Sequence, residues 1–229
     1  LDCSMSNKQQ SVTAVSLGVG FATGLYGISF GALSVAAGLD LWQTMALSLL
    51  MFSGGSQFAF IGVIATGAGV VPAILSAWLL GVRNGFYAIR MNPVLSVRTL
   101  LKPVAAQLTI DESNAVSLLG EPDKRKERFG FWLTGVAVFI FWNVFTFVGA
   151  VVGSQIGNPT DWGLDAAAAA AFLGLIWPRL NQSKLLVLAV ASAFVATSLS
   201  VVLPAGIPVL LTAVLAVVFW LVGMRGDPK

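Results

Sequence analysis

The stretch FGFWLTGVAVFIFWNVFTFVGAVVG, residues 129–153, decides the fold class of this chain. It contains no charged residue, and it directly follows the strongly charged run KRKER at 124–128. The hydrocarbon core of a bilayer, about 30 Å thick, is crossed by roughly 20 apolar residues in a helix. Because backbone groups in lipid must be satisfied within the segment, we expect this stretch to be a transmembrane helix and not a strand.

The rest of the chain has the same character. Of the 229 residues, 57% are hydrophobic and only 10% are charged, against about 25% charged in an ordinary soluble domain. A soluble fold of this size could not hide so much apolar surface from water. The net charge of +3 does not indicate a nucleic-acid partner, because the basic residues lie beside apolar segments and not on one exposed face.

Seven segments are long and apolar enough to be transmembrane helices. They are 12–37, 42–66, 70–92, 129–153, 164–180, 184–203 and 206–224. The segment 93–128 carries both signs of charge, and we expect it to be a cytoplasmic loop with one or two short surface helices. The sequence therefore predicts an all-α membrane protein whose residues 1–229 form a single transmembrane domain.

Lysine and arginine are distributed unevenly between the two sides of this predicted bundle. If 93–128 is cytoplasmic, the opposite side holds only Lys8. The cytoplasmic side then holds Arg98, Lys102, Lys124, Arg125, Lys126, Arg128, Arg179, Lys184, Arg225 and Lys229. The positive-inside rule thus predicts a multi-pass protein of the cell inner membrane, with its N-terminus outside and its C-terminus in the cytoplasm. An odd number of spans agrees with that orientation.

Two short stretches resemble each other. Ala37-Gly38-Leu39-Asp40 precedes the second predicted span, and Trp162-Gly163-Leu164-Asp165 opens the fifth. Each aspartate is placed to accept hydrogen bonds from the first amides of a helix. Two interpretations stay open: a pair of ordinary helix caps, or an inverted repeat of helices 1–3 and 4–6 with the seventh helix added. Secondary transporters often contain such repeats and bind substrate where the repeats meet.

Arg83 is the most informative single residue. At a rise of about 1.5 Å per residue it lies roughly 18 Å into the third span, just past the middle of the bilayer. An arginine at that depth costs about 2.5 kcal/mol on insertion scales. No acidic residue lies in the interior of another span, away from its ends, to neutralise it. One interpretation is that Arg83 binds the carboxylate of a substrate in bidentate fashion. The other is that it reaches the inner headgroups or pairs with Asp111 or Glu112 from the following segment.

Arg83 belongs to a polar stripe. Tyr87 and Arg90 follow it at helical spacing on the same face, and Asn84 is adjacent. The opposite face carries Leu79, Val82, Phe86 and Ile89, which can meet lipid or other helices. The stripe predicts either a water-accessible cavity or a protein contact.

The second span contains Ser53-Gly54-Gly55-Ser56-Gln57-Phe58. Two adjacent glycines weaken a helix and permit unwinding or close approach. The serines and the glutamine bring hydrogen-bonding groups to the same level, and a lipid-facing amide would be costly. We therefore expect a partly broken helix beside the substrate path, with tight packing by small residues as the alternative. Gly24, Gly27 and Gly31 on the first span favour packing.

These segments resemble the AzlC family of branched-chain amino-acid exporters, from about Gly24 to the C-terminus. The matching motifs are Ser48-Leu49-Leu50-Met51-Phe52-Ser53-Gly54-Gly55-Ser56-Gln57-Phe58, Val82-Arg83-Asn84-Gly85-Phe86-Tyr87 with Pro93, and Asp111-Glu112-Ser113. The resemblance implies export of valine, leucine or isoleucine together with a small membrane subunit of the AzlD type. On this basis the predicted substrate-binding residues are Arg83, Asn84, Tyr87, Ser53, Gly54, Gly55, Ser56 and Gln57, and the predicted gating or coupling residues are Asp111, Glu112 and Arg90.

The chain departs from the family pattern at one motif. The family usually has asparagine, leucine, arginine and histidine where this chain has Gly81-Val82-Arg83-Asn84. A protein without any histidine cannot use a histidine proton relay. If export is coupled to protons, Asp111 and Glu112 are the nearest carboxylates.

Two other classes of function make different demands on the sequence. An intramembrane enzyme needs a nucleophile with a base, or a set of metal ligands. The chain has no histidine, its one cysteine is Cys3, and its spans hold no paired acids, so we expect no enzyme activity, no cofactor and no metal site. A non-transporting scaffold subunit is the alternative to a transporter, and it would require a protein partner for the polar stripe.

Overall fold

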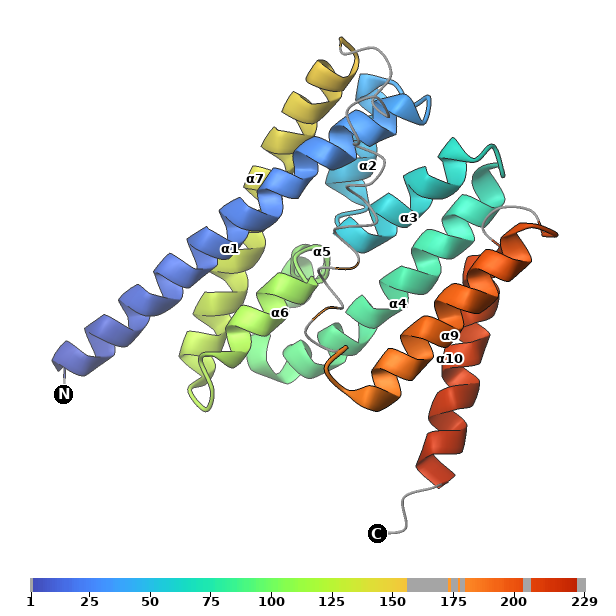
Figure 1. Cartoon of the computed structure of the whole chain (residues 1–229). Helices are drawn as coiled ribbons and strands as arrows, with labels where there is room; N and C mark the ends of the chain where they lie inside the picture. Colours follow the sequence, from blue (N-terminus) through green and yellow to red (C-terminus); the bar gives the residue numbers. More distant parts are fainter. Residues whose placement is uncertain (1, 156–172, 174–176, 178–179, 204–206, 226–229) are drawn as a thin grey trace.

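The computed structural model describes residues 2–155, 173, 177, 180–203 and 207–225, and Figure 1 shows the arrangement of their helices. Every regular element in these residues is a helix, as the sequence predicts. The predicted span 164–180 falls almost wholly outside them, and so does Asp165. The count of seven spans and the inverted repeat therefore remain predictions.

Two long helices form the scaffold. α1 (Asp2–Ala36) and α7 (Lys124–Gly153) lie side by side and run in the same direction (Figure 1). Their backbones approach closely, since a Cβ on Gly27 would lie only 2.7 Å from the carbonyl oxygen of Trp142. Glycine therefore permits this close packing, which is a common device between membrane helices. The packing role predicted for Gly24, Gly27 and Gly31 is confirmed, because a Cβ at each would collide with α7.

The predicted span 42–66 is not one continuous helix. α2 (Leu41–Leu50) and α3 (Gly54–Ala65) are separated by a break at residues 51–53, and each is too short to cross a bilayer. The predicted cap at Asp40 is confirmed, because its carboxylate accepts a hydrogen bond from the Gln43 amide at 2.7 Å. The predicted break is also confirmed, although it precedes the two glycines, which begin α3.

α4 (Val70–Leu95) agrees with the predicted span 70–92, and its Val82, Phe86 and Ile89 face outward as expected. Between α4 and α7 the chain forms η1 (Thr99–Leu101), α5 (Lys102–Gln107) and α6 (Asp111–Leu118). These short helices were predicted to lie on the surface, and for α6 that is wrong. Its Ser113 and Ser117 are fully buried against its neighbours, because small side chains on this face allow α6 to pack among the long helices.

The C-terminal part contains α9 (Ser183–Ser200) and α10 (Ile207–Arg225), close to the predicted spans 184–203 and 206–224. Three helices in the described part of the chain are long and apolar enough to cross a membrane. They are Val12–Ala36, Lys124–Gly153 and Ser183–Ser200. The structure contains no bilayer. Because α1 and α7 run in the same direction, the start of α1 lies at the same end of the bundle as Lys124, so an external N-terminus together with a cytoplasmic 93–128 does not agree with this packing (Figure 1).

Candidate functional site

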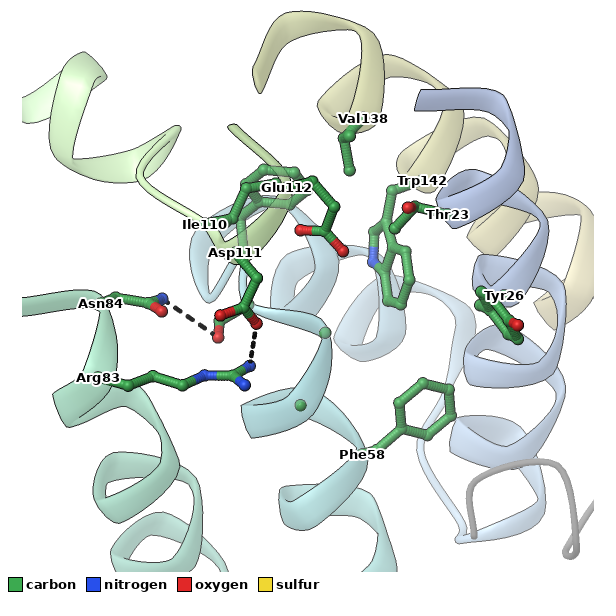
Figure 2. A pocket seen from close by; sticks show the side chains of 14 residues that line it. Thr23, Tyr26, Phe58, Arg83, Asn84, Ile110, Asp111, Glu112, Val138 and Trp142 are labelled. Atoms are coloured by element: carbon green, nitrogen blue, oxygen red, sulfur yellow. Dashed lines mark hydrogen bonds and ion pairs between the residues drawn. The ribbon is translucent and has the colours of Figure 1, made fainter. Parts of the chain in front are cut away.

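A pocket of about 310 Å³ lies where the α2–α3 break faces α1, α4, α6 and α7 (Figure 2). Its volume is at the lower end of the roughly 300–1,000 Å³ typical of small-molecule sites. The aromatic residues of the lining are Tyr26, Phe52, Phe58 and Trp142. The charged residues are Arg83, Asp111 and Glu112. The pocket therefore combines an apolar wall with both signs of charge.

Two glutamine side chains hydrogen-bond backbone carbonyls at the α2–α3 break, where the Leu47 carbonyl also accepts from the Met51 amide. The Gln57 side-chain amide donates to the carbonyl of Leu47 at 3.1 Å, and that of Gln107 on α5 donates to the carbonyl of Leu49 at 2.8 Å. A break at membrane depth is tolerated only when its free backbone groups are satisfied or line a cavity. Gln57, predicted to bind substrate, thus braces the break, and it does not line the pocket.

The amides at the start of α3 lack such a cap. Ser53 occupies the N-cap position but makes no side-chain capping bond. Its hydroxyl donates instead to Ser56 Oγ at 3.3 Å and accepts from Asn84 Nδ2 at 3.3 Å. The first turn, which begins with Gly54 and Gly55, lines the pocket without an acid or a capping side chain. A helix N-terminus of this kind carries a partial positive charge and donors suited to an anion.

The N-terminus of α6 also lies at the pocket, and it has both a capping side chain and acidic residues. Ser113 Oγ accepts a hydrogen bond from the Ile110 amide at 3.1 Å and donates to the Leu108 carbonyl at 2.6 Å. Asp111 and Glu112 occupy the first turn. Their negative charges are stabilised by the helix dipole at that end. The two helix N-termini at the pocket therefore have opposite character.

Arg83 forms an ion pair with Asp111, whose carboxylate lies 2.8 Å from the guanidinium (Figure 2). The expectation that Arg83 has no acidic partner at its depth is wrong, and the alternative of pairing with Asp111 is confirmed. The reason is that α6 packs against the middle of α4 and does not lie on the surface. The side chains keep 30% and 24% of their exposure, because both line the pocket.

Glu112 is the second carboxylate of the pocket. No basic side chain in the described part of the chain lies within ion-pair distance of it. α6 is too short to span the bilayer, and burial raises the pKa of this carboxyl above its ordinary value. Its own backbone amide and Arg83 counteract that increase, while the charge of Asp111 adds to it. A bound cation or a proton would therefore stabilise the Glu112 side chain.

Arg90 holds a separate position. It lies 3.0 Å from Glu121 and 3.6 Å from Glu127, and it donates to Asn114 Oδ1 at 2.8 Å. None of these residues lines the pocket. Arg90 therefore ties α4 to α6 and to the start of α7, two helical turns from Arg83, and its predicted role in gating is not tested by this arrangement.

The structure brings together most of the predicted site. Seven predicted residues line the pocket: Ser53, Gly54, Gly55, Arg83, Asn84, Asp111 and Glu112. Four do not: Ser56, Gln57, Tyr87 and Arg90. Tyr26, Phe58 and Trp142 were missed, because aromatic residues inside apolar spans give the same sequence signal whether they face lipid or a pocket. The indole N–H of Trp142 was the one available hint, since a buried donor needs a partner.

Comparisons with known proteins agree with this picture. The model of the AzlC protein family matches residues 18–156. An uncharacterized membrane protein of Helicobacter pylori strain J99 is 25% identical over 160 residues, which cover 69% of this chain and 70% of the relative. The inner membrane protein YgaZ of Escherichia coli K12 is 26% identical over 160 residues, covering 69% of this chain and 64% of the relative.

No solved structure matches this chain. The family match covers more than half of the chain and includes the break, Arg83 and both pocket acids. These residues thus lie within the part that is shared with the relatives. The chain is a helical membrane protein that belongs to the AzlC family.

Proposed function

We propose that this chain is a secondary transporter that exports valine, leucine and isoleucine across the inner membrane and acts with a small AzlD-type membrane subunit. Family membership and the membrane-protein relatives point to a role related to transport. The observation that carries the proposal is the pocket itself, where charged groups and an aromatic wall meet at a broken helix. Broken helices at binding sites are typical of secondary transporters.

The aromatic wall suits a branched aliphatic side chain. Phe58 and Trp142 pack edge to face with ring centroids 6.3 Å apart, and both are almost fully buried. Such a surface favours apolar groups but separates homologues that differ by one methylene by only about 1–3 kcal/mol. Transport of all three branched-chain amino acids by one pocket follows from that limit.

The small subunit and the orientation are parts of the proposal. Trp78, Phe86 and Ile89 on α4 are 68%, 68% and 73% exposed, so this face is available to lipid or to a neighbouring subunit. The excess of lysine and arginine in 93–128 supports a cytoplasmic position for that segment. Asp111, Glu112 and Arg90 are proposed to govern opening and coupling. Asp111 and Arg90 connect α4 to α6, and Glu112 is the pocket acid without an ion-pair partner among the described residues.

The direct test is transport of radiolabelled leucine by the chain and its small subunit in liposomes. We expect movement across the bilayer that unlabelled valine and isoleucine inhibit. The matched variants are Arg83→Ala, in the pocket, and Lys126→Ala, whose partner Asp123 is 3.9 Å away outside the pocket. Transport should fall strongly in the first and persist in the second.

Unchanged transport in Arg83→Ala would remove this residue from the mechanism. A stable complex that moves none of the three amino acids would instead favour the scaffold subunit.

A further inference from the structure

In the described part of the chain, the pocket has two acidic side chains but only one basic side chain. Arg83 and Asp111 neutralise each other at 2.8 Å. Glu112 is left without an ion-pair partner among the described residues, and its carboxylate points into the pocket beside the indole of Trp142 (Figure 2). A carboxylate in such surroundings is stabilised by a cation brought from outside. This side of the pocket therefore suits an ammonium group.

The start of α3, in contrast, would stabilise an anion. Its first turn, which starts at Gly54, has neither an acid nor a capping bond from Ser53. A second observation points to a ligand here. The side chain of Trp142 is only 3% exposed and lines the pocket, yet its indole N–H has no acceptor among the described residues. A buried donor without a partner is costly, and an anion bound in the pocket would supply the acceptor.

The Trp142 ring and the start of α3 are neighbours. A Cβ on Gly54 would lie 3.2 Å from Trp142 Cη2, so the ring packs directly on the glycine backbone. Glycine at 54 thus allows the indole ring to approach the start of α3 closely. The six-membered edge of the indole makes this contact, so the indole N–H and the amides of α3 are two separate donors that face the same pocket.

We infer that the pocket binds its substrate as an oriented zwitterion, with the α-ammonium group at Glu112 and the α-carboxylate at the uncapped start of α3 and the Trp142 indole. This deepens the proposed function and rests on it. Arg83 is then a positioning residue that holds Asp111, and it is not the main carboxylate ligand. The substrate class is an α-amino acid with both groups charged, and its side chain lies against the aromatic wall.

The test is binding of three probes to the purified chain with its small subunit, measured by calorimetry. The probes are L-leucine, the oxo acid that corresponds to leucine, and isopentylamine. The oxo acid lacks the ammonium group, and the amine lacks the carboxylate. In the unmodified protein we expect leucine to bind at least tenfold more tightly than either analogue.

Two variants separate the two ends of the site. Glu112→Gln should weaken leucine at least tenfold while the oxo acid binds unchanged or more tightly. Ser53→Asp, which places a carboxylate at the α3 N-cap, should weaken leucine and the oxo acid but leave the amine unchanged or tighter. The thermal midpoint of each complex shows that it is folded, and Glu112→Ala, which also removes the charge, replaces Glu112→Gln if that variant fails to fold.

The outcomes distinguish the inference from the proposed function. If the unmodified complex binds leucine but Glu112→Gln weakens leucine and the oxo acid equally, the ammonium assignment is wrong. If Ser53→Asp weakens the amine as much as the oxo acid, the carboxylate assignment is wrong. If the unmodified complex binds none of valine, leucine and isoleucine, the proposed function fails.

Discussion

The chain contains two helix breaks that face the same pocket, and the helices that begin after them differ in how their first amides are capped. The break at 108–110 carries its own cap, Ser113, and its own acids, Asp111 and Glu112. The break at 51–53 has its carbonyls capped by glutamines, whereas the amides that follow it are not capped by any side chain. The break at 108–110 therefore presents negative side chains to the pocket, whereas the break at 51–53 presents uncapped amides with a partial positive charge.

This difference teaches how a chain with few charges can build a polar site. Only 10% of the residues are charged, and the described lining of the pocket has one basic and two acidic side chains, so an anion must find part of its stabilisation in backbone dipoles. Leaving one helix start uncapped supplies positive character without a buried arginine or lysine. The arginine that is present, Arg83, is used to hold Asp111 in place.

The largest expected effect comes from removing the ion pair that joins the start of α6 to α4. Arg83→Gln leaves Asp111 without its ion-pair partner, and we expect the free energy of unfolding to fall by about 2–3 kcal/mol. That is less than the roughly 3–5 kcal/mol for a fully buried pair, because both side chains keep some exposure. Thermal unfolding in detergent measures the loss.

The control is the double variant Arg83→Gln with Asp111→Asn, which should recover part of the stability. The comparison variant Lys126→Gln removes an ion pair with a 3.9 Å separation and should change stability by less than about 1 kcal/mol. If the single and double variants are equally destabilised, the ion pair does not hold α6 in place.

The second prediction compares the caps of the two breaks. Gln57→Ala removes one of the two donors to the Leu47 carbonyl, which keeps the Met51 amide at 3.0 Å. Ser113→Ala removes the side-chain bonds to the Ile110 amide and the Leu108 carbonyl, which still bond each other at 3.1 Å. Each should cost about 0.5–1.5 kcal/mol of stability, because a side-chain hydrogen bond is lost while the backbone groups keep one partner. Gln107→Ala should cost less, since its bond to Leu49 is exposed.

Unfolding midpoints of the three variants at one detergent concentration give the ranking. A Gln57→Ala variant as stable as the unmodified chain would show that the first break is held by packing alone.

The smallest expected effect is a gain. Ser53→Asp gives α3 the acidic N-cap that it lacks, so that the break at 51–53 comes to resemble the break at 108–110. We expect stabilisation by about 0.5–1 kcal/mol, because the carboxylate can accept from the free amides of the first turn. Leucine transport should fall at the same time, and a variant that is both more stable and fully active would contradict the idea that these amides bind substrate.

A matched control is Ser96→Asp, at the C-terminal end of α4 and outside the pocket. It should leave transport unchanged, which excludes a general effect of added negative charge.

Much of this architecture could be predicted from the sequence. Long apolar runs define α1, α4, α7, α9 and α10 to within a few residues at most boundaries, because the bilayer imposes a length on each. The predicted break in 42–66 was also visible, since the two glycines and Gln57 stand out in an apolar segment. Seven pocket residues were predicted because they are polar or glycine in apolar surroundings.

Some features could not be predicted from sequence patterns. The charged segment 93–128 was expected at the surface because its composition is that of a loop. Yet α6 lies inside, where Arg83 compensates Asp111. Charge pairing between segments nearly thirty positions apart has no signature in a single sequence. Trp142 and Phe58 were missed because an aromatic residue gives no indication of which side of its helix meets a neighbour.

The sequence by itself determined that this chain is a helical membrane protein, where most of its long helices lie and which polar residues stand out from them. These properties follow from local composition, since each apolar run must satisfy its own backbone. Only the tertiary structure decided that α6 enters the bundle, that Arg83 pairs with Asp111 and that Glu112 is left opposite an uncapped helix start. Those relations depend on which helices pack together, and packing is a property of the whole chain.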